Sequence, residues 1–169
     1  MSTGGKKIAV IGAGPAGYTA AQELSKNGYT VDIYDKEDRL GGAIYTGIPE
    51  YRMSKIFLDK VFASMKEDKN ITFHFNTKID CERFEGLRKN YDKVLVATGA
   101  QIENTYGFEP GNGLYAGLTL LYDLNIRGNH EYYKKYKKAM VWGGGNVAMD
   151  CARSLVRIID DVSVVYRRS

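Results

Sequence analysis

The pattern of hydrophobic and polar positions along the chain predicts an alternation of short strands and helices. Short apolar runs rich in β-branched and aromatic residues indicate strands, and apolar positions three or four apart indicate helices. We expect strands over residues 7–11, 30–34, 71–75, 93–97, 140–142 and 162–166. We expect helices over residues 15–27, 55–67, 82–90, 118–126 and 146–158. This order predicts an α/β fold with parallel strands.

A strand, a glycine-rich turn, a helix and a further strand follow one another twice. The first turn is Gly12-Ala-Gly-Pro-Ala-Gly17 and comes directly after the strand 7–11. The second is Gly143-Gly-Gly-Asn-Val-Ala148, in which alanine takes the place of the last glycine. The glycines of this motif permit a tight turn, close approach of a pyrophosphate to the backbone, and close packing of the helix on the strand. Amides at the helix N-terminus then bind phosphate oxygens, so each turn predicts a dinucleotide site.

The residues that end the second strand differ between the two copies. Asp35 follows the strand 30–34, and its carboxylate can accept hydrogen bonds from both ribose hydroxyls of an adenosine. Arg167 and Arg168 stand at the corresponding place in the second copy, where guanidinium groups can pair with a 2′-phosphate. The second site is therefore expected to prefer NADP, unless the two arginines are only a solvated strand end. Two different ribose-binding groups indicate two coenzymes, which is typical of a flavin that takes hydride from a nicotinamide.

The composition is that of a globular protein with a core of its own. The 169 residues are 44% hydrophobic and 26% charged. No run of about 18 apolar residues is present, which argues against a membrane-spanning helix, and the polar first residues are unlike a signal peptide. Cys81 and Cys151 lie far apart without a CxxC, which indicates free thiols in a reducing compartment. We therefore expect a cytoplasmic protein.

Positive charge is concentrated near the C-terminus. Residues 127–169 contain 9 basic and 4 acidic residues, whereas residues 1–126 contain 15 and 16. A basic region can bind nucleic acid, or one anionic ligand such as a nucleotide phosphate. Residues 131–138 interleave tyrosines with lysines, as surfaces that bind single strands do. We interpret this stretch instead as a solvated connector before the strand 140–142.

No catalytic side chain and no metal site are predicted. Cys151 lacks a partner thiol and is interpreted as a core cysteine, and a disulfide reductase would need a paired CxxC. His74 and His130 share no metal-ligand spacing with the cysteines and are interpreted as structural or solvated. Hydride transfer needs none of these groups, because a flavin supplies the chemistry and the protein supplies positioning and electrostatics.

The order of motifs resembles that of the oxidoreductases similar to the small (beta) subunit of glutamate synthase. Beside the two glycine turns, the motifs that carry the resemblance are Asp35-Lys36, Arg39-Leu-Gly-Gly42, Tyr45-Thr-Gly-Ile-Pro-Glu-Tyr-Arg52, Val96-Ala-Thr-Gly99, Gly143-Gly-Gly-Asn-Val-Ala-Met-Asp150 and Val165-Tyr-Arg-Arg-Ser169. NADPH:ferredoxin oxidoreductase or sulfide dehydrogenase subunits and the N-terminal part of dihydropyrimidine dehydrogenase share this pattern. The resemblance extends over essentially the whole chain, from Lys7 to Ser169.

The resemblance implies Rossmann-like dinucleotide-binding βαβ units of an FAD/NAD(P)-binding domain fold. It implies the first part of an FAD domain over 1–100, a connector over 101–138 and the start of an NAD(P)H domain over 139–169. The residues that it assigns to FAD are Gly12, Ala13, Gly14, Pro15, Ala16, Gly17, Asp35, Lys36, Gly41, Gly42, Arg52, Thr98 and Gly99. The residues that it assigns to NADPH are Gly143, Gly144, Gly145, Asn146, Val147, Arg167 and Arg168.

The implied activity is transfer of hydride from NADPH, rather than NADH, to FAD, with electrons passed on to an iron–sulfur or large catalytic subunit. Proteins of this group are much longer and return to the FAD domain near their end, so the resemblance implies a fold incomplete at its C-terminus. Pyrimidine-, ferredoxin- or sulfide-linked chemistry is an alternative within the group. A truncated, non-catalytic dinucleotide-binding remnant and a nucleic-acid module are alternatives outside it, and no membrane partner is expected.

Overall fold

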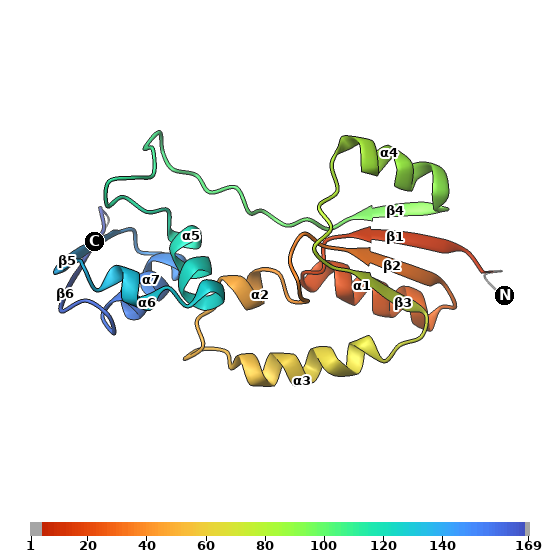
Figure 1. Ribbon diagram of the computed structural model, residues 1–169, viewed down its shortest axis with the longest axis horizontal. Helices are drawn as coiled ribbons and strands as arrows, with labels where there is room; N and C mark the ends of the chain where they lie inside the picture. The colour runs from red at the N-terminus through yellow and green to blue at the C-terminus, as the bar shows by residue number, and fades with distance from the viewer. Residues whose placement is uncertain (1–4, 168–169) are drawn as a thin grey trace. The chain divides into compact units, whose positions relative to one another are not determined.

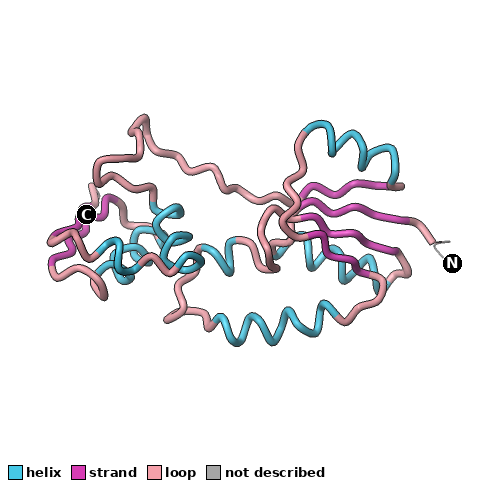
Figure 2. The backbone as a smooth tube through the Cα atoms, viewed as in Figure 1, coloured by secondary structure: helices cyan, strands magenta, loops and turns pink. Residues whose placement is uncertain are grey.

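The computed structural model describes residues 5–167, and these form two compact units (Figures 1 and 2). The first unit comprises Met1–Tyr45 and Ser54–Ala100, and the second comprises Thr46–Met53 and Gln101–Ser169. The chain therefore leaves the first unit at Thr46, contributes a short segment to the second, and returns at Ser54. We call residues 46–53 the 46–53 segment.

A sheet of four parallel strands forms the centre of the first unit. Its strands are β1 (Lys7–Ile11), β2 (Thr30–Tyr34), β3 (Ile71–His74) and β4 (Lys93–Val96). They lie in the order β3-β2-β1-β4, which Figure 1 shows side by side. The two central strands are the most buried, because strands with a neighbour on each side and helices on both faces are shielded from solvent.

Helices cover both faces of this sheet. The helices of the first unit are α1 (Pro15–Lys26), α2 (Ala43–Thr46), α3 (Lys55–Lys66) and α4 (Cys81–Asn90). Ala9 and Ile11 of β1 pack against Leu87 of α4. Val10, which points to the opposite face because side chains alternate along a strand, lies beside Gly17 of α1. α1 therefore lies against the sheet face opposite to α4.

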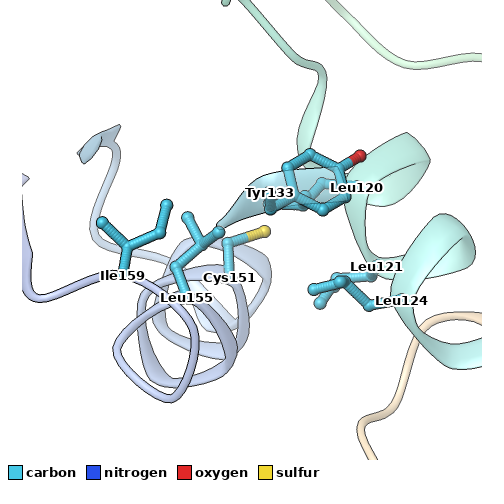
Figure 3. Close-up of a cluster of buried hydrophobic side chains, with 7 residues drawn as sticks. All are labelled: Leu120, Leu121, Leu124, Tyr133, Cys151, Leu155 and Ile159. Carbon is cyan, nitrogen blue, oxygen red and sulfur yellow. The ribbon is translucent and has the colours of Figure 1, made fainter. Parts of the chain in front are cut away.

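The second unit has a smaller sheet and a core between helices. Its elements are α5 (Gly117–Tyr122), the π-helical turn η1 (Asp123–Arg127), α6 (His130–Tyr133), β5 (Lys138–Trp142), α7 (Asn146–Leu155) and β6 (Asp161–Val165). The strands β5 and β6 are parallel. Figure 3 shows Cys151 and Leu155 of α7 directed toward leucines of the α5–η1 helix, with Tyr133 and Ile159 completing the cluster. This packing fixes α7, whose first turn follows the second glycine loop.

The predicted α/β class with parallel strands is confirmed, and so is every predicted strand and helix to within a few residues. Two short helices were not predicted: α2, and α6, which lies in the expected connector. The predicted helix 118–126 is observed as α5 continued by η1 and ends at Gly128, whose φ of 65° only glycine adopts easily. None of the helices described between residues 5 and 167 combines the length and apolar content that a membrane span requires.

Candidate functional site

The first glycine loop, residues 12–17, joins the end of β1 to the start of α1. Gly12 has a φ of +108° and donates its N–H to the carbonyl oxygen of Tyr34 at 2.8 Å. A Cβ at Gly12 would lie 2.3 Å from the carbonyl oxygen of Ala97. A Cβ at Gly17 would lie 1.8 Å from the carbonyl oxygen of Gly12. Both positions therefore require glycine, the first for the turn and the second for the close contact of α1 with the strand end.

A second glycine pair, Gly41 and Gly42, lies against this loop. Gly41 has a φ of +115° and donates its N–H to the carbonyl oxygen of Ala13 at 2.9 Å. A Cβ at Gly42 would lie 2.8 Å from the Cα of Gly14. Backbone therefore packs directly on backbone here, which leaves a surface of peptide groups that a ligand can approach closely.

Asp35 is fixed beside the same loop. One carboxylate oxygen accepts a hydrogen bond from the Ala13 N–H at 2.6 Å, and the other accepts one from the Glu37 N–H at 2.8 Å. A carboxylate can accept about four hydrogen bonds, so Asp35 keeps acceptor capacity for ribose hydroxyls. Lys36 next to it is half exposed and lies 3.9 Å from the carboxylate of Glu37.

Thr98 also lies at this end of the sheet. Its N atom is 3.1 Å from the position of a Cβ on Gly12, and Gly99 follows with a φ of +70°. The structure thus brings residues 12–17, Asp35, Gly41, Gly42 and Thr98 together at the carboxyl ends of the strands, where open parallel sheets bind ligands.

The second glycine loop, residues 143–148, joins β5 to α7 in the same way. Gly143 has a φ of +141° and donates its N–H to the carbonyl oxygen of Val165 at 2.9 Å. A Cβ at Gly144 would lie 2.9 Å from the ring of Tyr166, so the residue after β6 packs on this loop. A Cβ at Gly143 would lie 3.2 Å from the methyl group of Ala148, so the start of the loop and α7 approach each other closely.

The remaining predicted residues of the second site lie around this loop. Asn146 and Val147 form the first turn of α7, and Val147 packs against Gly117. Arg167 is exposed directly after Tyr166. Arg168 lies outside the described residues.

The helices α1 and α7 begin without a side-chain cap, in contrast to α3 and α4. Ser54 caps α3 and Asp80 caps α4, each by accepting a hydrogen bond from an amide of the first turn. The residues before α1 and α7 are Gly14 and Gly145, and neither helix has a side-chain hydrogen bond at its N-cap. Amides of the first turn have no partner within the helix, so the N-termini of these two helices can bind an anion.

Arg52, which the sequence resemblance assigns to FAD, lies in the second unit. Its Nη1 is 2.7 Å from a carboxylate oxygen of Asp150, a buried residue of α7. Tyr51 donates its hydroxyl to the carbonyl oxygen of Asp150 at 3.2 Å. Asp150 ends the motif that begins at Gly143, but nothing in the sequence indicates its pairing with Arg52, 98 residues earlier.

The remaining candidates are structural. Cys151 is buried in the core of the second unit, and burial raises the pKa of its thiol to about 12, which confirms its interpretation as a core cysteine. Nε2 of His74 lies 3.0 Å from a carboxylate oxygen of Asp32, with which it forms a hydrogen bond. Among residues 5–167 no group of histidine, cysteine and acidic side chains is arranged to hold a metal ion.

A groove of about 940 Å³ lies elsewhere in the first unit. It is lined by residues such as Lys6, Lys93 and Asp92, at the amino ends of β1 and β4, together with Asn27, just after α1. Proteins with open parallel sheets bind coenzymes at the opposite ends of the strands, which are the carboxyl ends. The groove is therefore not the candidate site.

Comparison with known proteins shows the family and the fold of the chain. Residues 6–169 match the family described as pyridine nucleotide-disulphide oxidoreductase. The beta subunit of the NADP(+)-dependent formate dehydrogenase of Moorella thermoacetica is 38% identical over 99% of this chain and 24% of its own length. The glutamate synthase [NADPH] small chain of Azospirillum brasilense is 34% identical over 97% of this chain and 36% of its own length. The chain thus spans about a quarter to a third of the curated relatives it matches.

Solved structures show the same fold. Mycobacterium tuberculosis FprA in complex with NADPH superposes with a TM-score of 0.83 at 24% identity, over 98% of this chain and 44% of that one. Thioredoxin reductase of T. acidophilum superposes with a TM-score of 0.59 at 18% identity, over 94% of this chain and 56% of that one.

Proposed function

We propose that this chain, which belongs to the pyridine nucleotide-disulphide oxidoreductase family, binds FAD at its first glycine loop and NADPH at its second. The observation that carries the proposal is the pair of helices, α1 and α7, that begin behind a glycine at a strand end without a side-chain cap. Each offers a positive helix end and first-turn amides to a pyrophosphate.

The close backbone contacts of the first loop fit FAD. Gly14 and Gly42 meet backbone to backbone, and a Cβ at Gly42 would close the space above Gly14. The residues proposed to line the FAD pyrophosphate and ribityl chain are therefore those of the 12–17 loop with Gly41 and Gly42. Asp35 would receive the ribose hydroxyls, with Lys36 beside it and Thr98 and Gly99 at the end of β4.

The positive charge beside the second loop fits NADPH. Residues 143–147 would bind the pyrophosphate through the N-terminus of α7. Arg167 follows the ring of Tyr166, which packs on Gly144 and thereby brings the chain after β6 to the loop. A guanidinium there favours a 2′-phosphate, which a carboxylate would repel. We propose the same role for Arg168, which the sequence places next to it.

The proposed activity is oxidoreduction. FAD, when bound, accepts a hydride equivalent from a reduced nicotinamide and passes its electrons on. The side chains named above bind and orient the coenzymes, and none of them is proposed as a proton donor or nucleophile. Two of the relatives are named as a subunit or small chain of a larger enzyme. We therefore propose that the electrons go to a partner protein, an iron–sulfur or large catalytic subunit, and that the protein acts in the cytoplasm.

Reconstitution tests the proposal directly. The purified chain is incubated with FAD, desalted, and then titrated with NADPH without oxygen. We expect retained flavin absorbance that bleaches on addition of NADPH. Binding of NADP⁺ without retention of flavin would indicate a nucleotide-binding remnant instead, and absence of binding of either coenzyme would reject the proposal.

A matched pair of arginine variants tests the second loop. Arg167→Gln is expected to weaken binding of NADP⁺ about tenfold while leaving NAD⁺ binding unchanged, because only NADP⁺ carries the 2′-phosphate. Arg88→Gln is the control, since Arg88 pairs with Glu85 on the surface of α4. An equal loss for both dinucleotides in Arg167→Gln would contradict the assignment.

A further inference from the structure

The 46–53 segment is held on α7 by a set of contacts centred on Asp150. Arg52 pairs with the Asp150 carboxylate at 2.7 Å, and Tyr51 donates its hydroxyl to the backbone carbonyl of the same residue at 3.2 Å. The Tyr51 ring lies 4.2 Å from the guanidinium carbon of Arg157 and 5.0 Å from that of Arg153. These contacts join one short segment to the helix that begins at the second glycine loop.

The segment is also fixed at its beginning. Asn125 of η1 donates a side-chain N–H to the carbonyl oxygen of Thr46 at 2.9 Å. Both ends of the segment are thus bound to the second unit, to which the segment belongs. Arg52 is therefore held in a defined place beside α7.

The charge of Asp150 conflicts with the proposed role of α7. Asp150 is four residues after Asn146, the first residue of the helix. It therefore lies about 6 Å along the axis from the N-terminus, and this is within the roughly 8 Å over which charges interact at physiological salt. Its side chain is only 8% exposed, so solvent screens it weakly. An unpaired carboxylate here would oppose the binding of an anion at the N-terminus of α7.

We propose that Arg52 is a positioning residue of the second dinucleotide site: it neutralises Asp150 and anchors the 46–53 segment on α7. The inference rests on the proposed function of the second loop. It differs from the role implied by the sequence resemblance, in which Arg52 lies near the flavin. Asp150 provides the buried anchor for the segment. Arg52 neutralises the Asp150 carboxylate, which would otherwise repel the pyrophosphate. Tyr51 supports the pair from the same segment.

Titration calorimetry with NADP⁺ on four forms of the chain tests this inference. The forms are wild type, Arg52→Met, Asp150→Asn and the double variant. We expect Arg52→Met to weaken binding about tenfold, because the carboxylate is left uncompensated beside the anion site. Asp150→Asn alone is expected not to weaken binding, because Arg52 then stands near the site without its partner. The double variant is expected to return to within about threefold of wild type.

This rescue separates a charge role from a merely structural one. If Arg52 only held the segment in place, removing Asp150 as well would leave the affinity as low as in Arg52→Met. That result, or wild-type affinity in Arg52→Met, would overturn the inference while the proposed function stands. A wild-type chain that releases no heat with NADP⁺ would reject the proposed function of the loop, and the inference with it.

Arg52→Lys and Asp150→Asn keep the test decisive if Arg52→Met does not fold. Arg52→Lys retains the positive charge and is expected to bind NADP⁺ within about threefold of wild type. Asp150→Asn retains Arg52, and a clear loss of affinity in this variant would contradict the inference by itself. Arg88→Met, which breaks the surface pair with Glu85 on α4, is the control for loss of an arginine as such.

Discussion

Asp32 shows how one buried carboxylate connects several elements of the first unit. It lies in β2, only 4% exposed, and accepts hydrogen bonds from Lys7 at 2.7 Å and from the hydroxyl of Tyr91 at 2.7 Å. His74 is a third partner at 3.0 Å, and the Tyr34 and Tyr91 hydroxyls lie 2.7 Å apart. Burial opposes the ionised form of Asp32, but hydrogen bonds from Lys7, His74 and Tyr91 outweigh it and hold the pKa of Asp32 below its usual value.

The lowered pKa of Asp32 predicts a loss of stability in acid. A carboxyl group with a lower pKa in the folded than in the unfolded state stabilises the fold above the unfolded pKa, and this contribution is lost as the pH falls through the folded pKa. We therefore expect the free energy of unfolding to fall below about pH 4, where unfolded aspartate is protonated. Urea unfolding at pH 7, 5 and 3 measures this free energy. Asp32→Asn should flatten this dependence, and an unchanged dependence in the variant would contradict the assignment to Asp32.

Glu103 acts as a cap for a helix that begins 14 residues later. Its carboxylate accepts hydrogen bonds from the Leu118 N–H at 2.5 Å and from the N–H and hydroxyl of Thr119 at 3.2 and 2.7 Å. We expect Glu103→Ala to lower the free energy of unfolding by about 1 kcal/mol, the usual cost of a lost N-cap. Glu109→Ala, in the same loop and exposed, is the control and should change it by less than about 0.5 kcal/mol. Equal effects in the two variants would show that the cap contributes nothing.

Neither of these carboxylates could be identified from the sequence. Asp32 resembles any charged residue in a strand, and its partners Lys7, His74 and Tyr91 come from three different parts of the chain. Glu103 lies in a loop rich in polar residues. Long-range partners of a polar side chain follow from tertiary packing, which hydrophobic periodicity does not describe.

At the scale of elements, the glycine loops were predictable because their chemistry is local. A strand, three glycines at fixed spacing and a helix are consecutive in the chain, and the positive φ of Gly12 and the contact of Gly17 follow from that order. The missed helices α2 and α6 are four residues each, too short to show a helical period. α2 is held instead by a neighbour, since Lys55 donates a hydrogen bond to the carbonyl oxygen of Tyr45 at 2.7 Å.

A pair of glycine variants tests the close contact at the first loop. In Gly17→Ala the new Cβ would lie 1.8 Å from the Gly12 carbonyl oxygen, so α1 has to move away from the strand end. We expect a loss of about 2 kcal/mol in the free energy of unfolding and loss of flavin retention. Gly86→Ala is the matched control, because Gly86 lies in α4 and its Cβ would meet nothing within 4 Å. It should stabilise the chain by about 0.5 kcal/mol, and a similar loss in both variants would contradict the contact.

At the scale of the whole molecule, the place of the 46–53 segment could not be predicted from the sequence. The 46–53 segment lies between two parts of the first unit in sequence, yet it belongs to the second. The resemblance assigns Arg52 to a coenzyme by its position in a motif near Gly41 and Gly42, and the structure adds Asp150 as its partner. A sequence shows which residues are neighbours along the chain, but not the long-range contacts, such as that of Arg52 with Asp150, that accompany the segment's membership of the second unit.

Because the 46–53 segment belongs to the second unit, we can predict how each coenzyme protects the chain from amide hydrogen exchange. Binding slows exchange in the parts that it stabilises, including segments fixed to the binding element by buried contacts. NADP⁺ should therefore slow exchange in α7 and in the 46–53 segment together, since Arg52 and Tyr51 tie the segment to Asp150. FAD should slow exchange in residues 12–17 and in Gly41 and Gly42. The comparison is made by mass spectrometry on the same preparation with either coenzyme. In Arg52→Met, the protection of the segment by NADP⁺ should weaken more than the protection of α5. If NADP⁺ protects α7 but not the segment in the wild-type chain, the segment is not coupled to the second site.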